Sequence, residues 1–220
     1  LCMSSSVVGH KRAFGTDTVP GCYDDFEQAQ LITLVGSNTA WCHPVLFQRI
    51  KKYKEANPNV KVVVIDPRRT QTCDIADLHL PLNLGTDTWL FNGLLNSLSQ
   101  RNKIDSDYVE QHCDGLDDAV KSAQQSSGDI KALANTLGIN EEDLKQFYSW
   151  FCETEKSVTL YSQGVNQSSS GTDKVNSIIN CHLATGRIGK PGMGPFSMTG
   201  QPNAMGGREV GGLANTLAAH

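Results

Sequence analysis

The sequence lacks any apolar run long enough to cross a bilayer and any excess of positive charge. Its longest apolar stretches, such as residues 31–35 and 62–65, fall far short of the roughly 20 residues that a membrane-spanning helix needs. Its 19 basic side chains are outnumbered by 23 acidic ones, which gives a formal net charge of -4. Proteins that bind nucleic acid or anionic lipid usually carry a basic surface. We therefore expect neither nucleic acid nor a membrane among the partners.

Cysteine clusters are missing as well. The seven cysteines are scattered and form no CxxC pair, so the spacing predicts no zinc or iron–sulfur site within this segment. An odd number of dispersed thiols is typical of a reduced protein and predicts a cytoplasmic location. The chain also begins without an initiator methionine or a signal-like leader, and we expect it to be a segment of something longer.

Two nucleotide-binding fingerprints, GxGxxG and GxxxxGK[ST], do not occur. Neither the standard dinucleotide motif nor a P-loop is therefore predicted. What is present is an ordinary globular composition, with 39% hydrophobic and 19% charged residues over 220 positions. That length suits one large domain or two small ones.

Two short apolar runs, residues 31–35 and 61–65, are rich in β-branched side chains and end in Gly-Ser-Asn and Asp-Pro. Both patterns favour strands that are buried on two faces. Between them, Leu46, Ile50 and Tyr53 recur at helical spacing. Residues 31–66 therefore predict a strand–helix–strand crossover with parallel pairing.

Helical patterns dominate the next part of the chain. An apolar face recurs over residues 86–100, and a helical insertion is expected between about Asp105 and Glu155. Within it, two helices are predicted to meet at Gly138, with Asn140 as the second N-cap. This pair superficially resembles a helix-turn-helix, but the acidic start of its second helix favours an ordinary helical hairpin. Another strand is expected at residues 158–161 and another helix at residues 174–185.

Residues 186–220 hold nearly half of the chain's 20 glycines and show no apolar period. Such a segment is expected to be irregular, and partly disordered in the isolated chain, because its backbone suits wrapping around a ligand. The predicted fold class is α/β, with a mainly parallel, Rossmann-like sheet flanked by helices. A helical insertion and a glycine-rich, irregular C-terminal segment complete it.

The loops after the expected strands carry residues that suit a phosphorylated ligand. In parallel sheets, ligands bind beyond the carboxyl ends of the strands. The loops in question are residues 36–39, 66–70 and 85–87. They offer glycines for close backbone approach, arginines for phosphate and carboxylates for a ribose or a base. The residues alone therefore predict an α/β chain that binds a nucleotide-like cofactor.

Seven longer motifs are spread along the chain: CMSS at 2–5, GCYDDF at 21–26, GSNTAWCHP at 36–44, IDPRRT at 65–70, GVNQ at 164–167, HLATG at 182–186 and TGQPNAMGGREV at 199–210. Together they resemble the catalytic subunit of bacterial molybdenum nitrate reductases of the assimilatory type, within the molybdopterin oxidoreductase (DMSO reductase) family. This resemblance covers essentially the whole chain. It implies reduction of nitrate to nitrite by oxygen-atom transfer, with a molybdenum bis(molybdopterin guanine dinucleotide) cofactor. It also implies a 4Fe-4S cluster in the full-length enzyme, which this segment is not expected to bind.

The resemblance further implies roles for individual residues. Cys2 matches the protein ligand of molybdenum, and Arg208 matches an arginine that holds nitrate in the substrate funnel. Gln163, the third implied catalytic residue, and Gln167 match positions that face the pterin and the metal. The other implied cofactor-binding residues are Val35, Gly36, Ser37, Asn38, Thr39, Cys42, Asp66, Pro67, Arg68, Arg69, Thr70, Gly85, Thr86 and Asp87.

Domain organisation and partners follow from the same resemblance. Residues 1–155 are expected to form a dinucleotide-binding domain, and residues 156–220 to belong to a neighbouring α/β domain that carries cofactor and substrate loops. The expected partners are nitrate and an electron donor, such as ferredoxin, flavodoxin or an NAD(P)H-linked subunit. The segment alone is expected to bind no metal and to be inactive.

Two alternatives stay open. One is another molybdopterin oxidoreductase, such as a formate dehydrogenase, and the other is a non-catalytic nucleotide-binding fold. Formate dehydrogenases place histidine directly after the metal-binding residue, where this chain has Met3. That difference favours nitrate.

Overall fold

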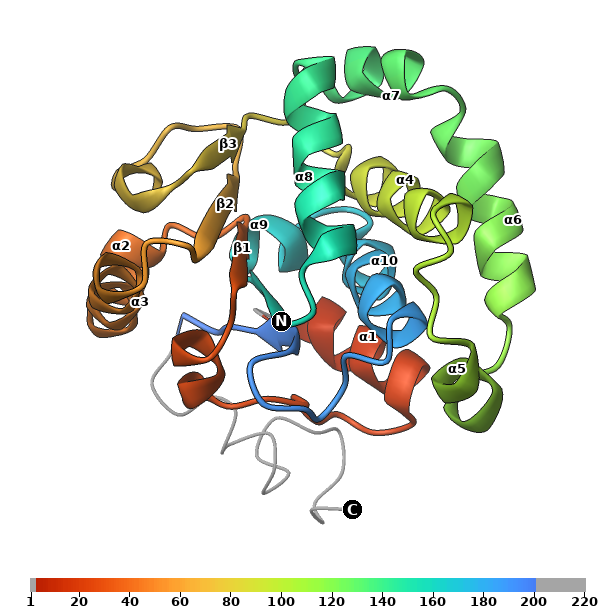
Figure 1. The fold of residues 1–220 in the computed structure, drawn as a ribbon, viewed down its shortest axis with the longest axis horizontal. Coiled ribbons are helices and arrows are strands. Elements are labelled where there is room, and N and C mark those ends of the chain that lie inside the picture. Colours follow the sequence, from red (N-terminus) through yellow and green to blue (C-terminus); the bar gives the residue numbers. More distant parts are fainter. Residues whose placement is uncertain (1–2, 201–220) are drawn as a thin grey trace.

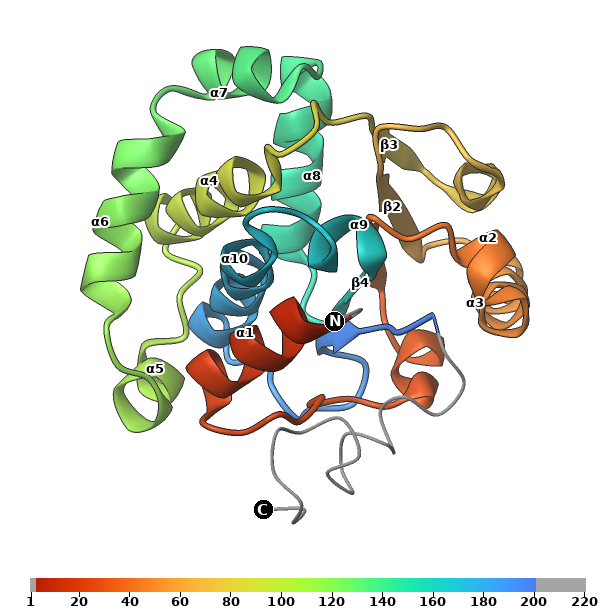
Figure 2. The same cartoon turned by 180° about the vertical axis from the view of Figure 1, so that it is seen from behind.

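The computed structural model describes residues 3–200, and these residues build a five-stranded parallel sheet (Figures 1 and 2). The strand order is β3-β2-β1-β4-β5. The strands are β1 (Leu31–Val35), β2 (Lys61–Ile65), β3 (Leu78–Leu80), β4 (Ser157–Tyr161) and β5 (Gly194–Ser197). Every described strand pair is parallel, so the predicted fold class is confirmed.

Side chains of the central strands alternate between two apolar cores, one on each face of the sheet. Leu31 and Val35 of β1 join the first core, whereas Ile32 and Leu34 join the second. Helices α1 (Ser4–Phe14), α4 (Asp87–Gln100), α8 (Glu141–Glu153) and α10 (Gly171–Ala184) cover the first face, and α3 (Pro44–Ala56) covers the second (Figure 1). Each fully buried leucine or isoleucine contributes about 1.5–3 kcal/mol to this packing. The predicted crossover from β1 through α3 to β2 is confirmed.

The helical insertion lies between α4 and β4 and forms the outer arc of the molecule in Figure 1. It consists of α5 (Ser106–His112), α6 (Leu116–Ser127), α7 (Ile130–Leu137) and α8. The last two helices meet at Gly138, whose φ of 72° is left-handed. Asn140 caps α8, because its side chain accepts a hydrogen bond of 2.7 Å from the backbone N–H of Glu142. Both predictions for this hairpin are confirmed.

Some elements differ from the sequence-based expectation. The segment expected to be irregular contains β5, which pairs with β4 and is buried along its length. Pro195 is tolerated there because β5 lies at the edge of the described sheet. The rest of that segment, residues 201–220, lies outside the described residues. Strand β4, which follows residue 155, pairs with β1 in the same sheet. The division of the chain into two domains at residue 155 stays a prediction.

Four short helices complete the described chain. These are the 3-10 turns η1 (Tyr23–Glu27) and η2 (Gln71–Ile75), together with α2 (Thr39–Cys42) and α9 (Gln163–Asn166). Helices α2 and α9 directly follow the loops after β1 and β4, which places them at the carboxyl edge of the sheet. Across residues 3–200, no helix has both the length and the apolar character that a membrane span requires.

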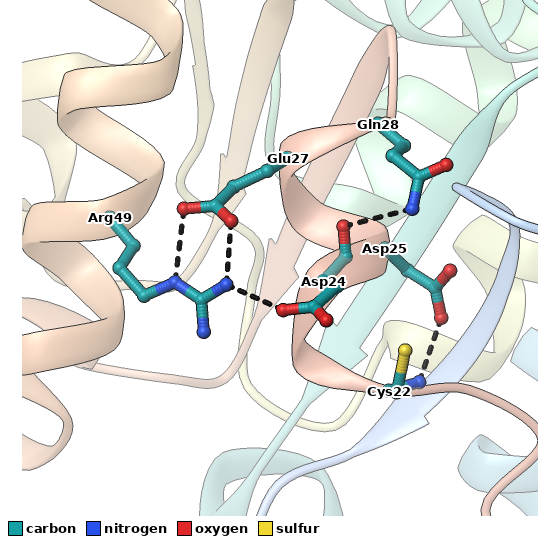
Figure 3. Close-up of polar contacts among 6 residues, drawn as sticks. All are labelled: Cys22, Asp24, Asp25, Glu27, Gln28 and Arg49. Carbon is teal, nitrogen blue, oxygen red and sulfur yellow. Dashed lines mark hydrogen bonds and ion pairs between the residues drawn. The ribbon is translucent and has the colours of Figure 1, made fainter.

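Arg49 of α3 ties the η1 turn to the body of the protein (Figure 3). Its Nε and Nη2 atoms donate to the Glu27 carboxylate at 3.0 and 2.6 Å, and Nη2 also donates to Asp24 at 2.8 Å. These hydrogen bonds hold the pKa of Glu27 below its ordinary value. In the same turn, Asp25 accepts hydrogen bonds from the backbone N–H groups of Cys22 and Gly192. The turn is therefore fixed both to α3 and to the loop before β5.

An Arg49→Lys substitution should loosen this turn slightly, because lysine cannot reproduce the two-pronged contact with Glu27. Both side chains are more than one-third exposed, so the expected loss is only about 0.5–1 kcal/mol. Since the pKa of Glu27 is lowered in the folded state, the stabilisation is present above its unfolded pKa and is lost as the pH falls through the folded pKa. Amide exchange of residues 23–28 should be faster in the variant at pH 7, and the difference should disappear once the pH has fallen through the folded pKa of Glu27. A difference that persists in acid would contradict this role for Glu27.

Candidate functional site

A cavity of about 560 Å³ opens at the carboxyl edge of the sheet, within the range typical of cofactor sites. The loops after four strands and the region that begins α10 surround it. Its lining residues are Gly36, Asn38, Cys42, Ile65, Asp66, Pro67, Arg68, Leu82, Asn83, Leu84, Gly85, Asp87, Gln163, Gly164, Gln167, Ser168, Ser169 and Lys174. The charged residues in this set are the acidic pair Asp66 and Asp87 and the basic pair Arg68 and Lys174.

The cavity lies where the winding of the sheet reverses. Strand β1 has β2 on one side and β4 on the other, and the connections that lead to them cover opposite faces of the sheet (Figures 1 and 2). In open parallel sheets, this switch point leaves a crevice between the diverging loops, and ligands bind there. The fold therefore predicts a ligand site at the place where the cavity is found.

Two glycines bring the loops after β1 and β4 into contact. Gly36 has a φ of +54°, and a Cβ added to it would lie 2.8 Å from the Cα of Gly164. The backbone N–H of Gly164 also donates to the carbonyl of Gly36 at 2.9 Å. Any side chain at residue 36 would therefore push the two loops apart.

Most of the predicted cofactor-binding residues meet in this cavity. The loops at 36–39, 66–70 and 85–87 each contribute to its wall, as does the short helix α9. The predicted residues that line it are Gly36, Asn38, Cys42, Asp66, Pro67, Arg68, Gly85, Asp87, Gln163 and Gln167. The structure thus brings together loops that the sequence analysis identified separately.

Six predicted residues do not line the cavity, and their assignment as ligands stays a prediction. Val35 is buried in the first apolar core, and the hydroxyl groups of Ser37 and Thr39 bond to each other at 2.9 Å. The hydroxyl of Thr86 donates to the carbonyl of Asn83. The remaining two are Arg69, which is exposed, and Thr70, whose carbonyl accepts from Cys73. Cys2 and Arg208 lie outside the described residues.

One side of the cavity offers hydrogen-bond donors to an anion. The Asp66 carboxylate is 6% exposed and accepts a hydrogen bond of 2.8 Å from the backbone N–H of Arg68. The Arg68 guanidinium is 73% exposed and only 3.8 Å from that carboxylate at Nε, which leaves most of its donors available. In the part of the chain that the structure describes, no protein group accepts a hydrogen bond from the backbone N–H of Asn38, a residue that lines the cavity. A free N–H group together with an arginine suits a phosphate.

Lys174 is the main cavity residue that sequence reasoning missed. Its side chain is 3% exposed, and its Nζ lies 2.6 Å from Oδ2 of Asp87. The ion pair joins the first turn of α10 to the first residue of α4. The sequence contains a signal for the burial of this lysine, because Lys174 shares one face of its helix with Ile178 and Cys181, which are fully buried. A lysine on a buried helix face usually has a specific partner.

Cys42 differs from the buried cysteines of the chain. It is exposed and lines the cavity. Burial raises the pKa of the Cys73, Cys152 and Cys181 thiols, so these stay protonated and unreactive at neutral pH. Within residues 3–200, no three side chains of His, Cys, Asp or Glu come together in a group that suits a metal ion.

Comparison with protein families gives a match over residues 1–219 to the model described as molybdopterin oxidoreductase. The chain belongs to the molybdopterin oxidoreductase family.

Relatives within this molybdopterin oxidoreductase family are much longer than the chain. A nitrate reductase from Shewanella frigidimarina is 56% identical over the whole chain, which spans 23% of that protein. A nitrate reductase from Klebsiella oxytoca is 53% identical, and the chain spans 25% of it. A periplasmic nitrate reductase from Desulfovibrio desulfuricans is 37% identical, and the chain spans 30% of it. The chain therefore corresponds to less than a third of the length of each of these relatives.

A solved structure has a similar fold. The acetylene hydratase from Pelobacter acetylenicus superimposes with a TM-score of 0.66 at 21% sequence identity. The superposition covers 83% of this chain and 24% of the hydratase. At this identity the likeness concerns the fold alone, and it agrees with the parallel sheet and its flanking helices.

Proposed function

We propose that this chain is part of a molybdenum-dependent nitrate reductase that reduces nitrate to nitrite. We further propose that its cavity holds a guanine dinucleotide arm of a bis(molybdopterin guanine dinucleotide) cofactor. The observation that carries the proposal is the convergence of the three predicted loops and helix α9 in one cavity at the switch point of the sheet. Similarity to relatives that are named nitrate reductases supports the choice of substrate.

The residues around the cavity suit such a nucleotide. Arg68 and the free N–H group of Asn38 would contact phosphate oxygens. The carboxylate of Asp66, beside Arg68, and that of Asp87 would accept hydrogen bonds from a sugar hydroxyl or a base. Gly36 and Gly164 leave no side chain between the two loops. The lining therefore offers hydrogen-bond donors to a phosphate and hydrogen-bond acceptors to a sugar or a base.

When bound, the cofactor supplies the molybdenum centre at which nitrate gives up one oxygen atom. Cys2 would ligate the metal through its thiolate, a soft ligand that suits molybdenum. Arg208 would hold the nitrate anion with charged hydrogen bonds. Gln163, on the cavity side of α9, would fix the orientation of the pterin. These roles come from the resemblance of the motifs, and for Gln163 its place in the cavity supports them.

We infer that the whole enzyme is assimilatory and cytoplasmic, takes electrons from ferredoxin, flavodoxin or an NAD(P)H-linked subunit, and carries a 4Fe-4S cluster outside this segment. The cytoplasmic assignment rests on the scattered, unpaired thiols. Because one relative is named periplasmic, fractionation of the source cells provides the test. Recovery of the enzyme with periplasmic markers would contradict the assignment.

Substrate turnover by the whole enzyme tests the proposal. With a reduced viologen dye as electron donor, nitrate should be consumed and an equal amount of nitrite formed. With the oxidised dye, formate should cause no dye reduction. Formate oxidation without nitrate reduction would point to the formate dehydrogenase alternative. Binding of a guanine nucleotide without turnover of either substrate would favour a non-catalytic fold.

Alkylation of Cys42 tests the location of the cofactor. Since this thiol is exposed and lines the cavity, iodoacetamide should label it quickly in the cofactor-free protein and at least tenfold more slowly in the loaded protein. Cys22 is also exposed but precedes η1 and is not among the residues that line the cavity, so its labelling should not change. Mass spectrometry of the digested protein gives both rates. Equal labelling of Cys42 in the two forms would contradict a cofactor in this cavity.

A further inference from the structure

We propose that Lys174 is a positioning residue that makes the Asp87 side of the cavity selective for a guanine base. This inference rests on the proposed function, because it concerns the nucleotide that the cavity holds. It adds a residue from α10 that none of the motifs contains, and it states what that residue does to the ligand preference of the site.

The geometry of the Lys174–Asp87 pair is the first argument. The two charged groups are 2.6 Å apart, and the side chains are 3% and 16% exposed. Charges held away from water in this way are retained only when they are well paired. The ammonium has three N–H donors, yet Asp87 is its only hydrogen-bonding or ionic partner within residues 3–200. Lys174 lines the cavity, so its remaining donors are available to a ligand there.

The charge of the pair argues against phosphate and for a base. A phosphate placed here would meet the Asp87 carboxylate, and like charges at contact distance repel. Arg68, in the loop after β2, has no carboxylate closer than 3.8 Å in the described chain and is the better phosphate site. The Lys174–Asp87 pair is neutral overall and presents a donor beside an acceptor. A polar, uncharged ring edge is the ligand that matches it.

Guanine has the edge that fits best. It carries an oxygen acceptor, O6, followed by two donors, N1–H and the 2-amino group. Lys174 would donate to O6, and the two Asp87 oxygens would accept from N1–H and the 2-amino group. Hypoxanthine, the base of IMP, lacks the 2-amino group, and adenine replaces the oxygen by a donor. The pair therefore discriminates among purines through the orientation of the Asp87 carboxylate.

Lys174 controls this discrimination because it holds that carboxylate in place. Asp87 is the first residue of α4, and its side chain has no other hydrogen bond or ion pair within the described chain. Without the ammonium, the carboxylate is free to rotate. The 2-amino group then loses its fixed acceptor, and the preference for guanine over hypoxanthine should disappear.

Binding of free nucleotides to the cofactor-free whole protein tests the inference. The protein is prepared from cells that cannot make the pterin, and GMP and IMP are titrated by calorimetry. The wild type should bind GMP roughly ten- to a hundredfold more tightly than IMP, as expected for hydrogen bonds to a charged group. In Lys174→Met this ratio should fall to near one. Lys121→Met, on the exposed side of α6, is the matched control and should leave the ratio unchanged.

Two further variants separate positioning from a merely structural role. Asp87→Asn should lower the GMP:IMP ratio as Lys174→Met does, and the double variant should lower it no further, because both changes act through one carboxylate. Lys174→Arg keeps the charge and should retain a clear preference for GMP. If Lys174→Met fails to fold, the arginine variant decides the question. A ratio lost as fully in Lys174→Arg as in Asp87→Asn would overturn the inference.

The outcomes also distinguish this inference from the proposed function. If Lys174→Met weakens GMP and IMP equally and leaves their ratio intact, Lys174 is only structural and the inference is wrong, while the cavity remains a nucleotide site. If the wild-type protein binds neither nucleotide, the proposed cavity function fails, and the inference fails with it.

Discussion

Replacement of Cys2 by serine in the whole enzyme is expected to abolish nitrate reduction at every nitrate concentration. A thiolate is a soft, electron-donating ligand, and a serine hydroxyl is a hard one that changes the potential of the metal. Raising the substrate concentration cannot compensate for such a change, so kcat should fall while molybdenum stays bound. Steady-state kinetics together with molybdenum analysis measure both quantities. Near-normal turnover in Cys2→Ser with molybdenum bound would show that Cys2 is not an essential ligand.

Arg208→Ala provides the contrast for the Cys2 variant. If Arg208 holds nitrate in the funnel, its loss removes a charged hydrogen bond worth about 1.5–3 kcal/mol, or roughly ten- to a hundredfold in affinity. KM for nitrate should therefore rise while kcat changes much less. A fall in kcat with an unchanged KM would contradict a binding role for Arg208.

A Gly36→Ala substitution should have the second large effect, the loss of cofactor from the purified enzyme. Residue 36 has a φ of +54°, and its new methyl group would lie 2.8–2.9 Å from three backbone atoms of Gly164 and Val165. The packed backbone of α9 has little freedom to move, so the loops must separate and the crevice between them must change shape. Left-handed strain of about 1–2 kcal/mol adds to overpacking of about 1–3 kcal/mol. Molybdenum and released guanine per protein chain should drop at least tenfold.

Gly15→Ala is the matched control for that substitution. Gly15 has a similar left-handed φ of +75°, but nothing lies within 4 Å of an added Cβ, and it follows α1 rather than a cavity loop. The control should therefore show only the backbone strain, as a slightly lower stability with full cofactor content. If Gly36→Ala retained its cofactor as Gly15→Ala does, the close contact at the switch point would not be needed for binding.

The parts of the fold that the sequence predicts are those with strong local signals. The β-branched runs that form β1 and β2 are apolar on both faces. The boundary between α7 and α8 has two separate signals, because Gly138 ends one helix and Asn140 caps the next. Helix α1 was not predicted, because its buried residues are Ser6, Gly9 and His10 rather than an apolar stripe. Strands β3 and β5 have only three and four residues, too few for a clear pattern, and β5 depends on pairing with β4, which is distant in the sequence.

The candidate site was likewise predictable only where the sequence carries a local signal. The rule that ligands bind at the carboxyl ends of parallel strands was enough to select the loops at 36–39, 66–70 and 85–87. It did not reveal that Gly36 touches Gly164 or that Lys174 pairs with Asp87, because both contacts join segments far apart in the chain. Such contacts become visible only once the order of the strands is known.

A structure of the whole enzyme, purified with its cofactor, tests the location of the nucleotide most directly. We expect a guanine nucleotide in the cavity at the β1/β4 switch point, with phosphate oxygens near Arg68 and the base within hydrogen-bonding distance of Asp87. A nucleotide bound elsewhere, with this cavity filled by another part of the protein, would contradict the proposed function of the segment.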